Sequence, residues 1–332
     1  MLARTEADPV KRRHFVAGLA AAAVVPGLAG GQGRKTPLVG YLFPGPAAYG
    51  ANRLINFREG LRYSGWNDEQ VEIAARFAEN EVAKNAQFAN ELLELKPDVL
   101  VAIAAVAVDA ARAATKTTPI IAFDLETDPV ASGIAASLAH PGGNVSGLYF
   151  DFPDFSTKWM ELLKEIISQI NSIIVVLDPA SPSPQLKGII AVAATLSVAV
   201  ETMEVRTVSD FDDVFRAASA RRPDAVVILS SPLIGMNPNR IADLTVAYRL
   251  PTICPFTEFA RAGGLIAYGI DLPGAARQVG VMAGKVLKGI RPAELPIERP
   301  TKFELAINLK TANALGLHLP QTLLATADEV IE

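Results

Sequence analysis

Carboxylates, one histidine and one cysteine are the groups in this chain that could do chemistry. Asp124, Glu126 and Asp128 alternate with other residues directly after an apolar run. Clustered carboxylates can perform acid–base catalysis or bind a metal ion. They equally fit a solvated loop in which Asp128 caps a short helix that begins at Pro129. We expect the solvated loop, with no metal and no cofactor.

His140 and Cys254 lack the partners that catalysis requires. A catalytic histidine needs a nucleophile or a carboxylate within hydrogen-bond reach, and the chain contains no GxSxG, HExxH or CxxC motif. The Pro141-Gly142-Gly143 run after His140 precedes a strand-like segment at 145–149, whereas phosphate loops lead into a helix. We therefore predict a turn with an exposed histidine. A single cysteine also excludes an intrachain disulfide. Because these motifs and partners are missing, no catalytic residue is predicted.

Composition and charge indicate the number of domains and the kind of partner. The chain has 332 residues, of which 50% are hydrophobic and 20% charged, enough to bury the cores of two domains. The formal net charge of −4 gives no indication of the strongly basic surface that binds nucleic acid, so no nucleic-acid partner is expected.

The first 31 residues have the order of an export signal. Lys11-Arg12-Arg13 precedes an apolar, alanine-rich run at 16–28, and small residues follow. Pro26 and Gly27 interrupt this run, which is short for a membrane span. The pattern fits a Sec or a twin-arginine signal. Because no cysteine lies in the cleavage region, we expect a periplasmic protein that is not a lipoprotein.

The elements that follow alternate between strand and helix in two series. Buried strands with no polar alternation, separated by helical periodicities, are typical of a parallel sheet covered by helices on both faces. Strands of the first series are predicted at 38–43, 71–77, 99–103 and 119–124, and those of the second at 172–178, 200–205, 225–229 and 252–256. The remaining pieces, including a strand-like run at 263–269, a helix at 272–288 and a strand at 303–309, are too few for a third domain. They must complete the first two.

Ligands of such sheets bind beyond the carboxyl ends of the strands. These ends carry most of the residues that we predict to contact a ligand in a cleft between two lobes. The predicted contacts are Tyr49, Ala105, Asp124 and Glu126 from the first lobe, and Asp178, Ser231, Phe256, Glu258 and Tyr268 from the second lobe or the hinge. Phe256 and Tyr268 could stack on an aromatic ligand, or could instead pack in the core near the hinge.

An ordered set of short motifs resembles one family along the whole chain. The motifs are Val39-Gly40-Tyr41-Leu42, Phe57-Arg58-Glu59-Gly60-Leu61, Thr127-Asp128-Pro129-Val130, the Ser137–Gly147 stretch, Glu258-Phe259-Ala260 with Gly263-Gly264-Leu265, Tyr268-Gly269, the run Pro300 to Asn308, and Ala325 to Glu332. The chain resembles the ABC transporter substrate-binding proteins of the tryptophan-binding (TrpX-like) group.

This resemblance implies a type I periplasmic binding protein fold, with two Rossmann-like lobes joined by a multi-strand hinge. The segments expected are 38–149 plus about 270–300 for lobe one, 150–268 plus about 303–332 for lobe two, and hinge segments near 145–152, 266–271 and 300–308. It implies a monomeric receptor that closes on a small molecule, such as an amino acid or an aromatic or other carboxylic acid. The receptor delivers it to a membrane permease with its ATPase. A receptor that feeds a sensor kinase, or a two-domain enzyme, remains an alternative.

One departure from the family pattern bears on the ligand. Members of the group usually carry a glycine, then a threonine or serine, then a proline after the third strand, whereas this chain has Ala104, Ala105 and Val106. The helix amides remain but the hydroxyl is lost. A tryptophan-like amino acid is therefore less well matched, and a more apolar or aromatic acid becomes an alternative ligand.

Overall fold

The first lobe is built on a five-stranded parallel sheet. A computed structural model describes residues 36–123, 128–150, 152–180 and 184–332, and the strand order in this sheet is β2-β1-β3-β4-β5. The strands are β1 (Leu38–Phe43), β2 (Glu72–Phe77), β3 (Val99–Ala102), β4 (Ile120–Ala122) and β5 (Val145–Gly147). β1, β3 and β4 are buried along their whole length, as their unbroken apolar sequences predict.

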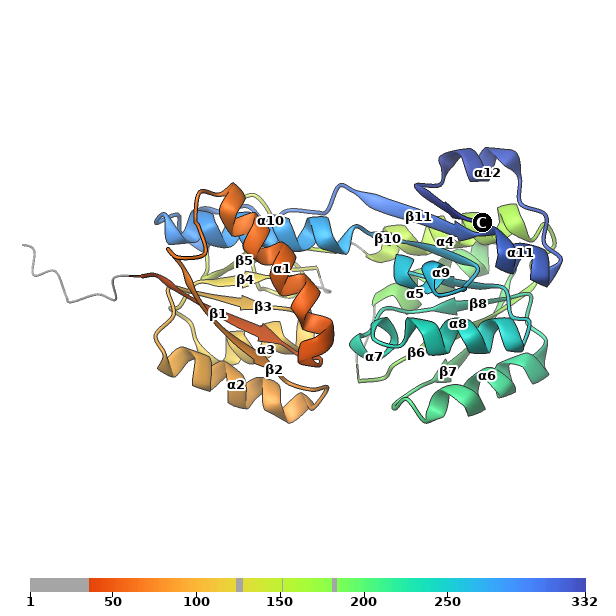
Figure 1. The fold of residues 1–332 in the computed structure, drawn as a ribbon, viewed down its shortest axis with the longest axis horizontal. Helices are drawn as coiled ribbons and strands as arrows, with labels where there is room; N and C mark the ends of the chain where they lie inside the picture. The colour runs from red at the N-terminus through yellow and green to blue at the C-terminus, as the bar shows by residue number, and fades with distance from the viewer. Residues whose placement is uncertain (1–35, 124–127, 151, 181–183) are drawn as a thin grey trace, which may run out of the picture. The chain divides into compact units, whose positions relative to one another are not determined.

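Helices cover both faces of this sheet. In Figure 1, α1 (Ala47–Tyr63) and α10 (Leu272–Leu287) lie on one face, and α2 (Val82–Glu94) and α3 (Ala104–Ala114) lie on the other. α1 and α10 pack with their backbones in contact, because a Cβ at Gly60 would lie 1.9 Å from the Arg277 carbonyl oxygen. The last turns of these two helices are joined by Trp66, whose indole N–H donates to the Gly284 carbonyl at 3.0 Å.

The second lobe has a seven-stranded sheet in the order β12-β11-β10-β9-β8-β6-β7. Its strands are β6 (Ser172–Leu177), β7 (Ala199–Glu204), β8 (Ala225–Ile228), β9 (Thr252–Cys254), β10 (Ile266–Ile270), β11 (Phe303–Asn308) and β12 (Glu329–Ile331). β6 to β10 run parallel to one another, whereas β11 runs antiparallel to β10 and β12 runs parallel to β11. The reason is topological: β10 carries the chain out of this lobe, and β11 brings it back along the same edge.

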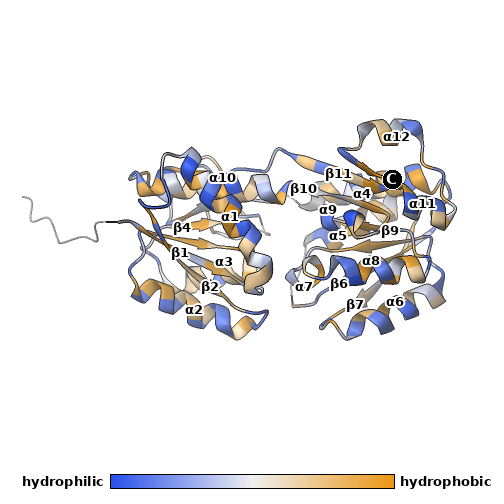
Figure 2. Cartoon of the chain, in the orientation of Figure 1, coloured by the Kyte–Doolittle hydropathy of each residue, from blue (hydrophilic) through white to orange (hydrophobic). Residues whose placement is uncertain are grey.

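The helices of lobe two divide the hydrophobic core between two faces. α4 (Phe152–Ile166) and α5 (Pro184–Thr195) cover one face, and α6 (Asp210–Arg221) and α8 (Pro238–Ala247) the other. Shorter helices are α7 (Pro232–Gly235), α9 (Thr257–Arg261), α11 (Leu309–Leu315) and α12 (Gln321–Thr326), and a short 3-10 helix, η1 (Pro292–Glu294), lies beside β5. Figure 2 colours central strands such as β1 and β4 as hydrophobic, whereas the helices show mixed hydropathy.

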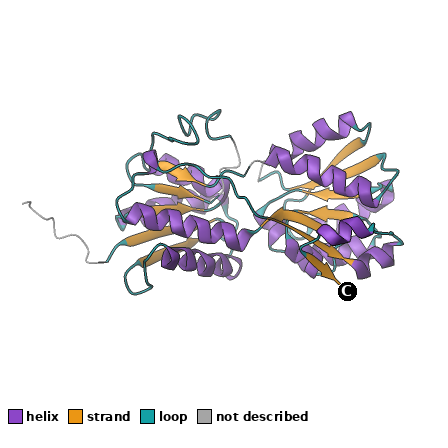
Figure 3. Cartoon of the chain, turned by 90° about the horizontal axis from the view of Figure 1, so that it is seen from above, coloured by secondary structure: helices purple, strands orange, loops and turns teal. Residues whose placement is uncertain are grey.

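The chain passes between the two sheets three times. The passages connect β5 to α4, β10 to α10, and the segment after η1 to β11; Figure 3 shows the sheets with helices on both sides. The predicted class of two α/β lobes with parallel sheets is confirmed, with the reversed edge strands β11 and β12 as the departure. The short helices α7 and α9 were not predicted, because four or five residues carry no helical periodicity.

The stretch around His140 forms the predicted turn. His140 is exposed, and its amide donates to the Ser137 hydroxyl at 3.0 Å. Gly142 has a φ of 79°, a conformation that favours glycine. The segment before it is not a strand, so the turn leads into β5 from irregular backbone. The proposed export signal at 1–31 lies outside the described residues. Within them, no helix is long and apolar enough to span a membrane.

Candidate functional site

An aromatic cavity lies where the carboxyl ends of the strands of both lobes meet. Aromatic and aliphatic side chains supply most of its lining, and the polar groups include two serine hydroxyls, the Tyr49 hydroxyl and one arginine. The lining residues are Phe43, Pro44, Tyr49, Arg53, Ile103, Ala104, Phe123, Phe150, Phe155, Trp159, Ser230, Ser231, Pro232, Pro255, Phe256, Gly269, Ile270 and Leu272. Such a lining, apolar with a few placed polar groups, is typical of a small-molecule site.

Lobe one contributes rings from strand ends and from the first helix. Phe43 ends β1 and Phe123 follows β4, and both are buried. Tyr49 lies in the first turn of α1, with its ring centroid 6.1 Å from that of Phe43. Arg53, one turn later, donates to the Tyr49 hydroxyl at 3.0 Å. Strand ends and a helix start therefore hold this wall together.

Lobe two contributes the first turns of α4 and the segment before α9. Phe155 and Trp159 are one turn apart on α4, with ring centroids 6.2 Å apart. The Trp159 indole N–H donates to the Tyr268 carbonyl at 2.8 Å, which fixes the ring with its polar atom paired. Phe256 precedes α9, and Ser231 caps α7 by accepting from the Ile234 amide at 3.2 Å.

The two walls touch across the cavity. A Cβ at Gly235, in α7 of lobe two, would lie 2.7 Å from the Tyr49 hydroxyl oxygen of lobe one and 3.4 Å from the Phe256 ring. The side-chain amide of Asn80 in lobe one lies 3.9 Å from the Met236 sulfur in lobe two. The lobes are thus close enough for one small ligand to contact both.

A polar pocket adjoins the aromatic cavity and shares Pro44, Ala104 and Pro232 with it. Charged and amide side chains gather here beside the start of α3. Its lining is completed by Asn80, Val82, Asn85, Ala105, Val106, Asp109, Asp178, Ala180, Arg206 and Leu233. Asn85 is buried, and its side-chain oxygen accepts no hydrogen bond within the described part of the chain.

Asp178 is the buried carboxylate of this polar pocket. It follows β6 and is 7% exposed. Burial raises the pKa of Asp178, while the Ala180 amide, the Ser231 hydroxyl and the charge of Arg206 act in the opposite direction. Ser231 also lines the aromatic cavity, and its hydroxyl connects Asp178 to that cavity. A cationic group of a ligand could therefore pair with Asp178.

The predicted contacts are distributed over several pockets. Tyr49, Ser231 and Phe256 line the aromatic cavity, and Ala105 and Asp178 line the polar pocket.

Two further predicted contacts lie at neighbouring depressions. Glu258 is exposed and lines one together with Tyr49 and Arg53. The ring of Tyr268 stacks on Phe303 in another, with centroids 6.1 Å apart. Asp124 and Glu126 lie outside the described residues.

Several lining residues were not singled out from the sequence. Phe43 and Phe123 end or follow apolar strands, and Phe155 and Trp159 belong to a helix face, so each reads as core. Arg53 reads as a solvated helix residue. One signal was present: Tyr49 and Arg53 have the i,i+4 spacing that brings side chains together on a helix, directly after a strand end.

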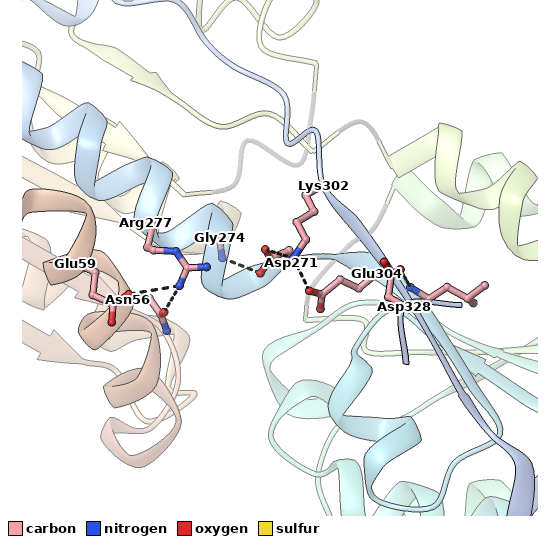
Figure 4. Close-up of polar contacts among 9 residues, drawn as sticks. Asn56, Glu59, Asp271, Gly274, Arg277, Lys302, Glu304 and Asp328 are labelled. Atoms are coloured by element: carbon pink, nitrogen blue, oxygen red, sulfur yellow. Dashed lines mark hydrogen bonds and ion pairs between the residues drawn. The ribbon is translucent and has the colours of Figure 1, made fainter. Parts of the chain in front are cut away.

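A network of polar contacts joins the second and third passages between the lobes (Figure 4). Asp271 caps α10 by accepting from the Gly274 amide at 2.8 Å, and Lys302 donates to Asp271 and Glu304 at 3.0 Å each. Burial opposes ionisation of Asp271, but the Gly274 amide and the Lys302 ammonium outweigh it and hold the pKa of this carboxyl below its usual value. From α10, Arg277 reaches Asn56 of α1 at 2.9 Å.

Neither a metal-binding cluster nor a reactive thiol is found among the described residues. No group of three or more His, Cys, Asp or Glu side chains among them could hold a metal ion. Cys254 is buried, and burial raises the pKa of its thiol to about 12, so the reactive thiolate is suppressed.

Comparison with known proteins assigns the chain to a family. The model of the ABC transporter substrate binding protein family matches residues 46–331. The chain belongs to this family of ABC transporter substrate-binding proteins. The prediction from the sequence motifs is confirmed, and the chain is the substrate-binding component of an ABC transporter. The family consists of non-enzymatic, extracytoplasmic binding proteins.

Three relatives illustrate the similarity of this substrate-binding protein. A tyrosine-binding protein of Clostridioides difficile (strain R20291) is 26% identical over 264 residues, which are 79% of this chain and 75% of the relative. The crystal structure of an ABC domain from Streptococcus pneumoniae in complex with L-Trp is 25% identical, with a TM-score of 0.81 over 89% of this chain and all of that one. A conserved domain protein from Vibrio cholerae has 24% identity and a TM-score of 0.79 over 90% of this chain and all of that one.

Proposed function

We propose that this substrate-binding protein captures a small aromatic carboxylic acid, a class that includes the aromatic amino acids, in the aromatic cavity. The observation that carries the proposal is the lining: Phe43, Tyr49 and Phe123 face the cavity from lobe one, and Phe155, Trp159 and Phe256 from lobe two. Aromatic side chains favour offset or edge-to-face contact with a ligand ring. A tyrosine-binding relative and an L-Trp complex point to the same class.

Capture proceeds by closure of the lobes about the three passages between them. The segments near 145–152, 266–271 and 300–308 act as the hinge, with lobe one formed by 38–149 plus about 270–300. A ligand that contacts both walls stabilises the closed state because only that state offers both sets of contacts. The closed receptor, exported to the periplasm by the signal at 1–31 and acting as a monomer, then docks on an inner-membrane permease with a cytoplasmic ATPase.

The proposal is tested by a binding screen on the purified protein, after bound ligand is removed by partial unfolding. The panel contains L-Trp, L-Tyr, L-Phe, their deaminated acids, and sugars as the control class. A true ligand at 100 times its Kd stabilises the protein by about 2.7 kcal/mol, which a thermal shift detects. A Trp66→Phe variant leaves Trp159 as the single tryptophan, so a change in its fluorescence on adding a non-indole ligand places that ligand in the cavity. Stabilisation by sugars alone contradicts the proposal.

A further inference from the structure

Arg53 is the one charged side chain in the lining of the aromatic cavity within the described residues. Its guanidinium carbon lies 5.0 Å from the ring centroid of Tyr49, 5.5 Å from that of Phe123 and 5.7 Å from that of Phe43. These cation–π contacts and the bond to the Tyr49 hydroxyl hold the group against the wall. The charge is therefore positioned toward the ligand space by three rings and a hydroxyl.

The positive charge of Arg53 has no protein counter-ion in the described part of the chain. No carboxylate oxygen there forms an ion pair with it, whereas Arg58 and Arg62 on the same helix both pair with Asp68. A guanidinium has five N–H donors, and the bond to Tyr49 uses one of them. Arg53 thus retains charge and donors beside an apolar cavity, where an anion would find little competition from water.

We propose that Arg53 is the specificity-determining residue that selects ligands carrying a carboxylate. The planar fork of the guanidinium matches a carboxylate with two parallel hydrogen bonds, while the ring of the ligand occupies the aromatic lining. This inference rests on the proposed function and sharpens it. The cavity binds the anionic acid in strong preference to its neutral, otherwise equal amide.

Two other roles for Arg53 make different predictions. In the first, Arg53 only completes the wall, so that its removal weakens every ligand alike. In the second, its counter-ion is Glu258, which lines the neighbouring depression from lobe two and would pair with Arg53 when the lobes close further. In that case removal of either charge weakens closure, and hence binding, whether or not the ligand carries a carboxylate.

The test compares indole-3-propanoate with indole-3-propanamide by calorimetry on the purified full chain. We expect the acid to bind about 10- to 100-fold more tightly than the amide, the range set by a charge-assisted hydrogen bond. In Arg53→Met the ratio of the two affinities falls toward one, and in Arg53→Lys it is intermediate. Arg58→Met, on the same helix but paired with Asp68, is the matched control and keeps the ratio of the unmodified protein.

Each contrary result has its own meaning. Equal affinities for acid and amide in the unmodified protein, or an equal loss of both in Arg53→Met, overturn the role of Arg53 while the aromatic cavity stands. If Glu258→Gln loses as much affinity as Arg53→Met for both probes, Glu258 is the counter-ion of Arg53. That result also overturns the role of Arg53 in selecting a carboxylate. If neither probe binds while sugars do, the proposed ligand class itself has failed. Thermal melts of each variant separate these results from unfolding.

Discussion

Lobe one and lobe two line the same cavity with aromatic rings, but they build their walls differently. On lobe two, Trp159 and Phe155 are 1% and 6% exposed and belong to the main hydrophobic core. On lobe one, Tyr49 and Arg53 are only half-buried and project from the first turns of α1. The charges differ as well, because lobe one offers a cation while lobe two offers serine hydroxyls with Asp178 behind them. Core packing thus holds the rings of lobe two in place, whereas lobe one sets the half-buried Tyr49 and Arg53 in front of the buried Phe43 and Phe123.

The largest expected effect is a difference in stability between alanine variants of the two walls. Trp159→Ala removes a fully buried ring and its bond to the Tyr268 carbonyl, and should lower the free energy of unfolding by about 3–5 kcal/mol. Tyr49→Ala removes a half-buried ring and should cost about 1 kcal/mol. Denaturant unfolding of the ligand-free variants measures both losses, while ligand binding should weaken in each. Equal losses of stability in the two variants would contradict the difference between the buried rings of lobe two and the half-buried Tyr49 of lobe one.

The contact between the two walls can be disrupted by adding a single carbon atom. Gly235→Ala adds a Cβ within 2.7 Å of the Tyr49 hydroxyl, and overpacking of this kind costs about 1–3 kcal/mol. Because the strain exists only when the lobes approach, we expect an affinity loss of about 5- to 100-fold with little change in the stability of the open protein.

The double variant Gly235→Ala with Tyr49→Phe provides the control. It removes the hydroxyl that the added methyl group meets, so it should recover part of the affinity. If Tyr49→Phe rescues nothing, the walls do not meet at this point.

The charge of the second wall is tested at Asp178. Asp178→Asn should weaken ligands that carry an ammonium group, such as L-Trp, by about 10-fold or more, and leave indole-3-propanoate unchanged. Since burial raises the pKa of Asp178, the ionised carboxylate destabilises the fold at neutral pH, and stability of the parent is recovered as pH falls through the raised pKa. The variant should therefore melt higher than the parent at pH 7, and the difference should shrink toward pH 4. A constant difference across this range would contradict the assigned shift.

How far the sequence predicts this molecule depends on which residues carry the signal. The parallel strands and long helices follow from apolar runs and helical periodicity, and Tyr49, Ser231 and Phe256 follow from the rule that ligands bind at strand ends. Phe155 and Trp159 could not be told from core, because the same rings serve core and cavity. Arg53 could not be told from a solvated arginine, because its environment is made by Phe43 of the preceding strand and by Phe123, which is distant in sequence. Cavity residues contributed by tertiary contacts therefore escape local patterns.

The smallest expected effect concerns backbone strain, which the described cavity lining shows at one non-glycine residue. Ala104 begins α3 on the lobe-one side with a φ of 61°, a left-handed conformation that costs a residue with a Cβ about 1–2 kcal/mol. Ala104→Gly removes that strain but adds chain entropy to the unfolded state, so a net gain of about 0.5–1 kcal/mol is expected. The neighbouring Ala105→Gly, which has no positive φ to relieve, should instead destabilise by a similar amount. If denaturant unfolding shows a stability gain for Ala104→Gly and a loss for Ala105→Gly, the wall of lobe one stores backbone strain at Ala104. If both variants lose or both gain stability, Ala104 is not strained.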